Sequence, residues 1–287
     1  MRLCMTILVR DEEELLRANL EYHFARGVDF VIATDNRSRD RTPEILREYE
    51  SKKLLKYIYE PDDDYSQDLW VTRMARIAAL EYKMDWVIHA DADEFWRPLA
   101  GTIKGVLAAA EPETDGFSVE RSNFVPVAGY DTARPFYEQL IHRERVSRNV
   151  LGRALPPKVV HRCCEKVHVA QGNHSFSMEC REAVIESSSS LEVLHFPVRD
   201  YETFETRIKD GGRAYENNSR FSKAVGATWR EDYRLLREGR LKSEFDRRCW
   251  TDYQLFEGLR SGKVVRDVGL RNDLRKLFAS ELNNISL

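Results

Sequence analysis

The stretch that decides the fold is DWVIHADADEFW, residues 85–96. It begins with an apolar run, residues 86–90, which has the length and composition of a buried strand. Asp91, Asp93 and Glu94 then follow within four positions. If the extended backbone continues through Asp93, the side chains of Asp91 and Asp93 point to the same side. Two carboxylates held so close repel each other unless a cation or a proton lies between them. The pattern therefore predicts a site for a divalent cation with oxygen ligands.

A solvated acidic turn after a buried strand is the alternative interpretation, and for an isolated Asp-x-Asp it is the usual one. Here the hydrophobic strand before the carboxylates and the aromatic residues Phe95 and Trp96 after them favour a functional site.

The residues before this stretch alternate between strand and helix patterns. Strands are predicted over residues 3–9, 30–33 and 54–59, with helices between them and a further helix over residues 69–83. This β-α-β-α-β order predicts an α/β fold with a mostly parallel sheet flanked by helices. Ligands of such sheets bind beyond the carboxyl ends of the strands. Polar residues follow three strands in this way, so we expect them to meet at one edge: Arg10-Asp11, Asp35-Asn36 and Asp91 with Asp93.

Two arginines of the predicted helix 69–83, Arg73 and Arg76, are three residues apart and share one helix face. Ordinary surface arginines explain this spacing equally well. Arginine also suits bidentate phosphate contacts, so the same face is a candidate for holding a diphosphate.

Composition narrows the class of protein. The chain has 287 residues, 32% of them charged, with a net charge of −3, which argues against nucleic acid as the main partner. No apolar run approaches the ~20 residues that span a bilayer, and residues 1–10 are too short and too soon charged for a signal peptide. The five cysteines are odd in number and lack C-x-x-C spacing, which argues against zinc and against a disulfide framework. We expect a cytoplasmic protein, with peripheral membrane contact as a further option and no transmembrane segment.

These segments, taken together, resemble the GT-A glycosyltransferases, in particular the family 2-like group. The resemblance covers roughly the first third of the chain, and a looser match follows at residues 195–217. It is carried by residues 9–12, 34–42, 73–76 and 85–96. It implies a Rossmann-like GT-A domain that binds a nucleotide-sugar, most often a UDP-sugar, with Mn²⁺ or Mg²⁺ bridging the phosphates.

The resemblance also implies roles for single residues. Asp35, with Asn36 beside it, would contact the base, and Arg10 would lie beside the nucleotide. Asp91 would lie near the ribose and the metal, and Asp93 would be the metal carboxylate. The chain departs from the common pattern at Arg37, where a glycine is frequent in the family.

Histidines supply further candidates in the second half. His195 lies near the end of a predicted strand, residues 191–197, and a lone histidine there is more often structural than a ligand. GT-A enzymes, however, bring a C-terminal histidine to the metal, and imidazole beside carboxylate suits Mn²⁺ better than Mg²⁺. His174, beside a Gly-Asn turn, competes with His195 as the ligand. Residues 158–161 and 167–170 are expected to form a pair of strands.

The rest of the sequence predicts the domain boundary and offers candidates for a general base. Residues 201–287 have helical patterns, so we predict a GT-A domain over residues 1–200 and a helical C-terminal region over residues 201–287. An inverting transfer to a glycan or lipid-linked glycan acceptor, as in polysaccharide biosynthesis, needs a general base. His174 and Asp200 are the candidates carried forward, although Glu120 and Glu202 fit equally well.

Two other functions remain open. A nucleotidyltransferase would also use paired carboxylates and Mg²⁺, but it would usually carry a glycine-rich phosphate loop. Residues 3–16 contain no glycine. A non-catalytic carbohydrate-binding protein would keep the aromatic residues but would not need paired aspartates at a strand end.

Overall fold

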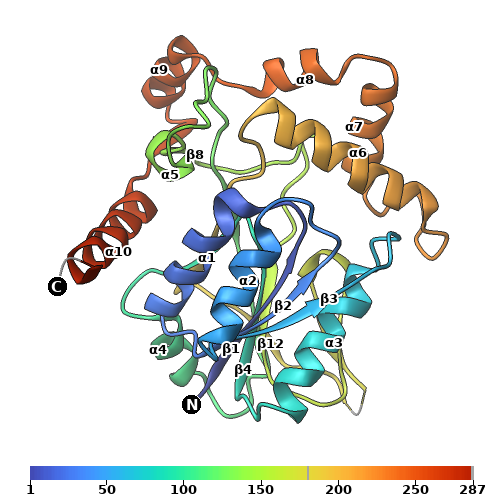
Figure 1. The fold of residues 1–287 in the computed structure, drawn as a ribbon, viewed down its shortest axis with the longest axis vertical. Coiled ribbons are helices and arrows are strands. Elements are labelled where there is room, and N and C mark those ends of the chain that lie inside the picture. Colours follow the sequence, from blue (N-terminus) through green and yellow to red (C-terminus); the bar gives the residue numbers. More distant parts are fainter. Residues whose placement is uncertain (180, 286–287) are drawn as a thin grey trace. The chain divides into compact units, whose positions relative to one another are not determined.

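The computed structural model describes residues 1–179 and 181–285, so Cys180 lies outside the described residues (Figure 1). The described chain forms two compact units, and each is described by itself. The first comprises Met1–Pro61, Ser66–Arg121 and Pro156–His195, and the second comprises Asp62–Tyr65, Ser122–Leu155 and the chain from Phe196 onward.

A seven-stranded sheet forms the centre of the first unit. Its strand order is β12-β6-β9-β4-β1-β2-β3. The strands β3, β2, β1 and β4 run parallel to one another, whereas β9 is antiparallel to both β4 and β6. The bounds are β1 (Leu3–Val9), β2 (Phe30–Asp35), β3 (Leu55–Tyr59), β4 (Trp86–Asp91), β6 (Gly116–Val119), β9 (Lys158–Arg162) and β12 (Ile185–Ser187). The predicted α/β fold with a mostly parallel sheet is confirmed.

Helices cover both faces of this sheet because alternate residues of each strand point to opposite sides. On β1, Met5 packs in one apolar cluster with Leu20 and Leu46, whereas Cys4 packs in another with Met74. The first cluster belongs to α1 (Glu13–Ala25) and α2 (Thr42–Ser51), and the second to α3 (Gln67–Leu80). Burial on both faces explains why these strands read as continuous apolar runs. A short helix, α4 (Ile103–Ala108), completes the helices of this unit in the described chain.

The backbone turns immediately after β4. The strand ends at Asp91, and the chain reverses through Ala92 and Asp93 into β5 (Glu94–Pro98), which pairs with β13 (Leu191–His195). The expectation of extended backbone through Asp93 is therefore wrong. The reason lies in α1, where the buried amide of Asn19 donates hydrogen bonds to the carbonyls of Ala92 (3.0 Å) and Glu94 (2.9 Å). These bonds hold the turn closed from a helix that lies far away in sequence.

Residues 158–161 and 167–170 do not form a pair of strands, so that expectation is wrong. β9 lies between β4 and β6, where its valines fill the middle of the sheet. β10 (Val167–Val169) instead pairs with β11 (Phe176–Met178) across the short helix η1 (Gln171–Asn173). The pairing follows from packing on α3, because Thr72 accepts a hydrogen bond from the Val169 N–H at 2.9 Å.

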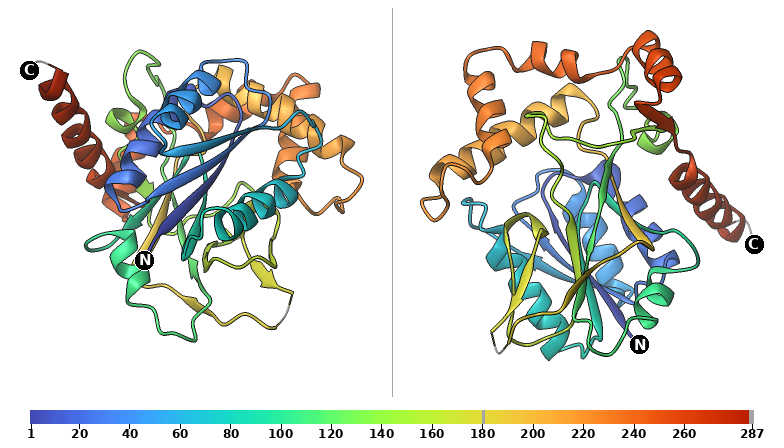
Figure 2. Two further views of the ribbon diagram at one scale, coloured as in Figure 1. Left: turned by 60° about the horizontal axis from the view of Figure 1, so that its bottom comes forward. Right: turned by 180° about the vertical axis from the view of Figure 1, so that it is seen from behind.

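The second unit is mostly helical (Figure 2). The chain enters it through β7 (Arg121–Asn123), and the predicted helical character of the C-terminal region is observed. Buried Phe204, Ile208, Leu235 and Phe245 form its apolar core. The other elements are α5 (Phe136–Gln139), β8 (His142–Glu144), α6 (Tyr201–Asn217), α7 (Ala227–Arg237), α8 (Leu241–Arg248), α9 (Asp252–Ser261), β14 (Val264–Arg266) and α10 (Gly269–Ile285). Within the described ranges, no helix is long and apolar enough to cross a bilayer.

Candidate active site

Strand register brings the predicted polar residues to one edge of the sheet. Val9, the residue before Arg10, is paired with Asp35, and Leu8 is paired with Asp91. The polar ends of β1, β2 and β4 therefore lie side by side, as expected from the parallel order. This edge is the candidate active site.

Asp91 is held by a buried lysine. Because β9 runs antiparallel to β4, its first residue, Lys158, lies near the carboxyl end of β4. Lys158 donates to Asp91 Oδ2 at 2.8 Å, and its ammonium lies 2.8 Å from Glu94 Oε2. Lys158 is 1% exposed and Glu94 is fully buried. Burial alone lowers the pKa of Lys158, but Asp91 and Glu94 raise it above its ordinary value, so the lysine stays charged.

Two more polar groups complete this cluster. Arg121 donates to Glu94 Oε1 at 3.1 Å, and the amide of Gln67 donates to Asp91 Oδ1 at 3.1 Å. Two carboxyl groups thus meet two cations, and burial raises the pKa of Glu94 although Lys158 and Arg121 oppose that shift. Lys158, Arg121 and Gln67 are not among the site residues predicted from the sequence. The available signal was Lys158 itself, a lysine directly before two valines of a predicted strand.

Asp93 and His195 meet on the other side of the turn. Asp93 is 2% exposed in the turn after β4, and His195 ends β13 opposite Glu94 in the β5–β13 pair. His195 Nε2 lies 3.7 Å from Asp93 Oδ2. Within residues 1–179 and 181–285, no group of three or more His, Cys, Asp or Glu side chains could hold a metal ion by itself. Two of the three predicted metal-binding residues therefore come together as a carboxylate–imidazole pair.

Asp35 is buried at the end of β2 and accepts hydrogen bonds, one of them from the loop that follows the strand. Its Oδ1 accepts from the Ser38 N–H at 2.9 Å, and its Oδ2 accepts from the Tyr57 hydroxyl at 2.9 Å. Burial, together with this bond to Asp35, raises the pKa of Tyr57 to about 12. Arg10 NH1 reaches Asn36 Oδ1 at 3.4 Å. Arg10 after β1 thus lies beside Asn36 after β2, and the contacts of Arg10, Asp35 and Asn36 with a nucleotide stay a prediction.

Hydrogen bonds join the loop after β2 to the loop after β1. Asp11 donates its N–H to Ser38 Oγ at 2.9 Å, and its Oδ1 accepts from the Arg39 N–H at 2.6 Å. Arg37 has φ of +65°, in the left-handed region that favours glycine. The conformation that a glycine would supply is therefore kept, with an arginine in its place.

Arg73 and Arg76 lie on α3 but bind different partners. Arg73 pairs with Glu60 at 2.9 Å. Arg76 donates to the carbonyl of Val167 at 2.9 Å and pairs with Glu179 at 2.8 Å. Both arginines therefore serve the first unit's own packing, and a contact with phosphate stays a prediction.

His174 and Asp200 occupy different units. His174 Nδ1 lies 2.8 Å from the carbonyl of Pro157, which can only accept, so Nδ1 carries the proton and Nε2 carries the lone pair. Burial, then Lys158 and Arg121, lower the pKa of His174 to about 4. Asp200, in the second unit, caps α6 by accepting from the Thr203 N–H at 2.8 Å.

Comparison with known proteins decides the family. A sequence model of glycosyltransferase family 92 matches residues 1–234, most of the chain. The chain belongs to glycosyltransferase family 92. The prediction of a GT-A-like glycosyltransferase is confirmed, and the nucleotidyltransferase and binding-protein alternatives give way to it. No curated protein sequence matches the chain.

Solved glycosyltransferase structures show weaker likeness to this family-92 enzyme. Residues 1–349 of Staphylococcus aureus TarS with UDP match at 13% identity and a TM-score of 0.41, covering 99% of this chain and 92% of that one. The mannosyltransferase PcManGT from Pyrobaculum calidifontis, with GDP-Man and Mn²⁺, matches at 20% identity and a TM-score of 0.34, covering 42% and 35%. Glucosyl-3-phosphoglycerate synthase from Mycobacterium tuberculosis, with Mn²⁺, UDP and phosphoglyceric acid, matches at 18% identity and a TM-score of 0.28, covering 42% and 43%.

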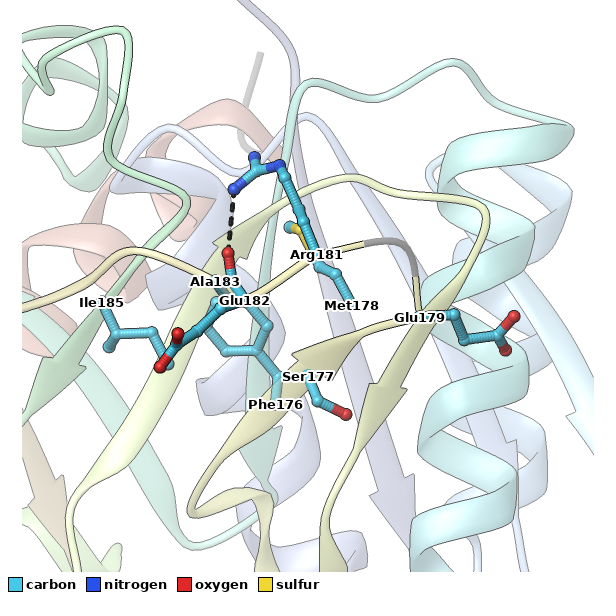
Figure 3. A pocket seen from close by; sticks show the side chains of 8 residues that line it. All are labelled: Phe176, Ser177, Met178, Glu179, Arg181, Glu182, Ala183 and Ile185. Carbon is cyan, nitrogen blue, oxygen red and sulfur yellow. Dashed lines mark hydrogen bonds between the residues drawn. The ribbon is translucent and has the colours of Figure 1, made fainter.

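A separate hollow of about 580 Å³ opens beside β11 in the first unit of this enzyme (Figure 3). None of the predicted site residues lines it. Its lining combines apolar and charged side chains of β11 and of the segment that leads to β12: Phe176, Ser177, Met178, Glu179, Arg181, Glu182, Ala183 and Ile185.

Proposed function

We propose that this glycosyltransferase transfers a sugar from a nucleotide-sugar, most readily a UDP-sugar, to a hydroxyl of a glycan or lipid-linked glycan, with inversion and with a divalent cation. One observation carries the proposal. The register of β1, β2 and β4 places Arg10, Asp35 and the turn after Asp91 at the same edge of the sheet. Parallel sheets bind nucleotides at this edge.

Asp93 and His195 are the residues that would hold the cation. A carboxylate and an imidazole give the oxygen and nitrogen donors that suit Mn²⁺ better than Mg²⁺. Two protein donors fit a cation that takes its remaining ligands from substrate phosphates and water. When bound, such a cation neutralises charge on the departing nucleoside diphosphate. Asp91 would face the ribose.

His174 is the favoured general base for deprotonating the acceptor hydroxyl. Its Nε2 lone pair is available because Nδ1 donates to the Pro157 carbonyl. The pKa of about 4 keeps the ring neutral at pH 7 but also weakens it as a base, because a general base works best with a pKa near the operating pH. Asp200 is the second candidate, with a carboxylate that already accepts one hydrogen bond. His174→Ala should lower kcat far more than Asp200→Asn if this order is right.

A donor-binding and hydrolysis panel tests the proposal. UDP-, GDP-, CMP- and dTDP-sugars are measured with Mn²⁺ and after chelation, on the wild type, on Asp93→Ala and on Glu113→Ala. Glu113 is an exposed carboxylate of the same unit and serves as the matched control. Binding of one nucleotide class, lost on chelation and in Asp93→Ala but kept in Glu113→Ala, is the expected result. A folded protein that binds none of the four donors overturns the proposal.

A further inference from the structure

Asp91 and Glu94, at the turn after β4, lie beside cations of the same unit. Lys158 lies 2.8 Å from both Asp91 Oδ2 and Glu94 Oε2, and Arg121 NH1 lies 3.1 Å from Glu94 Oε1. Glu94 is fully buried and Lys158 is 1% exposed, so solvent screens their contact little, whereas the side chain of Asp91 is 33% exposed. The second oxygen of Asp91 accepts from the Gln67 amide.

A resident ammonium changes what this turn offers to a metal ion. An aspartate pair with no counter-charge would attract a divalent cation by mutual repulsion alone, which is the argument that the sequence suggests. In the structure, the ammonium of Lys158 already supplies that positive charge to Asp91. A second cation at Asp91 would be repelled by Lys158 at short range.

We propose that Lys158 and Arg121 are a built-in counter-charge that keeps Asp91 and Glu94 out of metal coordination, so that the site takes a divalent cation only together with a nucleoside diphosphate. The diphosphate part of this inference rests on the proposed function. The inference departs from the sequence-based assignment of Asp91 as a metal ligand and makes Lys158 a positioning residue.

The expected consequence is strong coupling between metal and nucleotide. Asp93 and His195 give the cation one carboxylate and one neutral ring, a small charge for a divalent ion. A diphosphate adds hard oxygen ligands and negative charge to the same place. Because coupling is reciprocal, UDP should tighten Mn²⁺ binding by the same factor as Mn²⁺ tightens UDP binding, about tenfold or more.

The first experiment measures Mn²⁺ affinity from the paramagnetic resonance signal of free Mn²⁺, with and without UDP. The variants are Lys158→Met and Lys104→Met, the latter removing a surface lysine that pairs with Asp29 in the same unit at 2.7 Å. Lys158→Met should raise the UDP-free Mn²⁺ affinity about tenfold, because Asp91 and Glu94 lose their counter-charge. Lys104→Met should leave it unchanged. A folded Lys158→Met protein with wild-type Mn²⁺ affinity overturns the inference, as does a wild type that binds Mn²⁺ equally well with and without UDP.

A second pair of variants decides the matter if Lys158→Met does not fold. Asp91→Asn keeps the side-chain volume and can still accept from Lys158, whereas Asp93→Asn removes the proposed ligand charge. With UDP saturating for each variant, Mn²⁺ affinity should fall less than threefold in Asp91→Asn and more than tenfold in Asp93→Asn, so that any loss of UDP contact at Asp91 does not enter the comparison. Equal losses overturn the inference. A wild type that binds no nucleotide of any class instead defeats the proposed function, and the UDP-free Mn²⁺ measurement on Lys158→Met still tests the counter-charge.

Discussion

Two buried histidines on neighbouring strands form a continuous hydrogen-bond chain with Thr6. His161 Nδ1 lies 2.8 Å from the Arg162 carbonyl, which fixes the proton on Nδ1 and the lone pair on Nε2. His89 Nε2, 3.0 Å away, must then donate, and His89 Nδ1 accepts from the Thr6 hydroxyl at 2.7 Å. Each ring nitrogen of His89 and His161 already donates or accepts a hydrogen bond. A further proton on either ring would therefore break one of these hydrogen bonds.

This arrangement predicts that mild acid destabilises the enzyme. Burial lowers the pKa of His161, and separately that of His23, to about 4, from 6.5 in the unfolded chain. The unfolded state therefore binds more protons below pH 6.5, and stability falls as the pH falls from 6.5 toward 4. Between pH 7 and pH 5 each of these two histidines should cost about 2 kcal/mol of unfolding free energy. Urea unfolding at both pH values measures it.

The control for this prediction is His168, which is 48% exposed. His168→Ala should leave the difference in unfolding free energy between pH 7 and pH 5 unchanged. Equal stability of the wild type at the two pH values would contradict the assignment of neutral, buried rings.

Some residues of the candidate site can be predicted from the sequence and others cannot. Asp93 and His195 could be proposed because each follows an apolar strand. Lys158 could not, because its pairing with Asp91 joins residues that are 67 positions apart. The turn at Ala92 and Asp93 was missed for the same reason, since Asn19 holds it from α1.

At the scale of elements, the β4–β5 turn depends on the amide of Asn19. Asn19→Asp replaces the NH₂ donor by an oxygen that faces the carbonyls of Ala92 and Glu94. We expect a loss of about 3 kcal/mol in unfolding free energy, the cost of leaving buried polar groups without partners. We also expect weaker Mn²⁺-dependent donor binding, because the turn carries Asp93. Chemical unfolding and the donor panel measure the two effects.

Asn272→Asp, at an exposed position of α10, is the matched control and should change neither quantity. If Asn19→Asp unfolds at the same denaturant concentration as the wild type, the amide does not hold the turn.

A buried ion pair joins α7 and α8 beside their shared apolar cluster. Arg248 donates two hydrogen bonds to Asp232, at 2.9 and 2.5 Å, and both side chains are largely buried. Arg248→Met leaves the Asp232 charge buried without its partner, so unfolding free energy should fall by about 3–5 kcal/mol. Arg234→Met removes exposed ion pairs of α7 and should cost about 1 kcal/mol or less. Similar losses in the two variants, measured by urea unfolding, would refute the distinction.

Elements differ in how well the sequence predicts them. β1, β2 and β3 were found because each is an apolar run that polar turn residues close. β10 was assigned the wrong partner, because the valine-rich runs of β9 and β10 look alike and β9 pairs with β4 and β6, which lie far away in sequence. The family establishes a glycosyltransferase, but the general base has no spacing signal in the sequence.

At the scale of the whole molecule, the order of the chain and its division into units do not coincide. The segments of the first unit all lie before Phe196, whereas Ser122–Leu155 groups with the chain after His195. The strand β8 pairs with β14, and Arg275 of α10 pairs with Glu138 of α5. The sequence-based boundary at residue 200 therefore stays a prediction that truncation can test.

A chain ending at Asp200 should keep the seven-stranded sheet but lose order in residues 122–155. The sheet strands are all present in this fragment. Residues 122–155, in contrast, lose β14 and α10, which supply their strand pairing and their ion pair. Limited proteolysis and amide hydrogen exchange should therefore find cleavage and fast exchange in residues 122–155 of the fragment, with protection kept in β1, β2 and β4. Protection of residues 122–155 equal to that in the full chain would instead support an independent domain over residues 1–200.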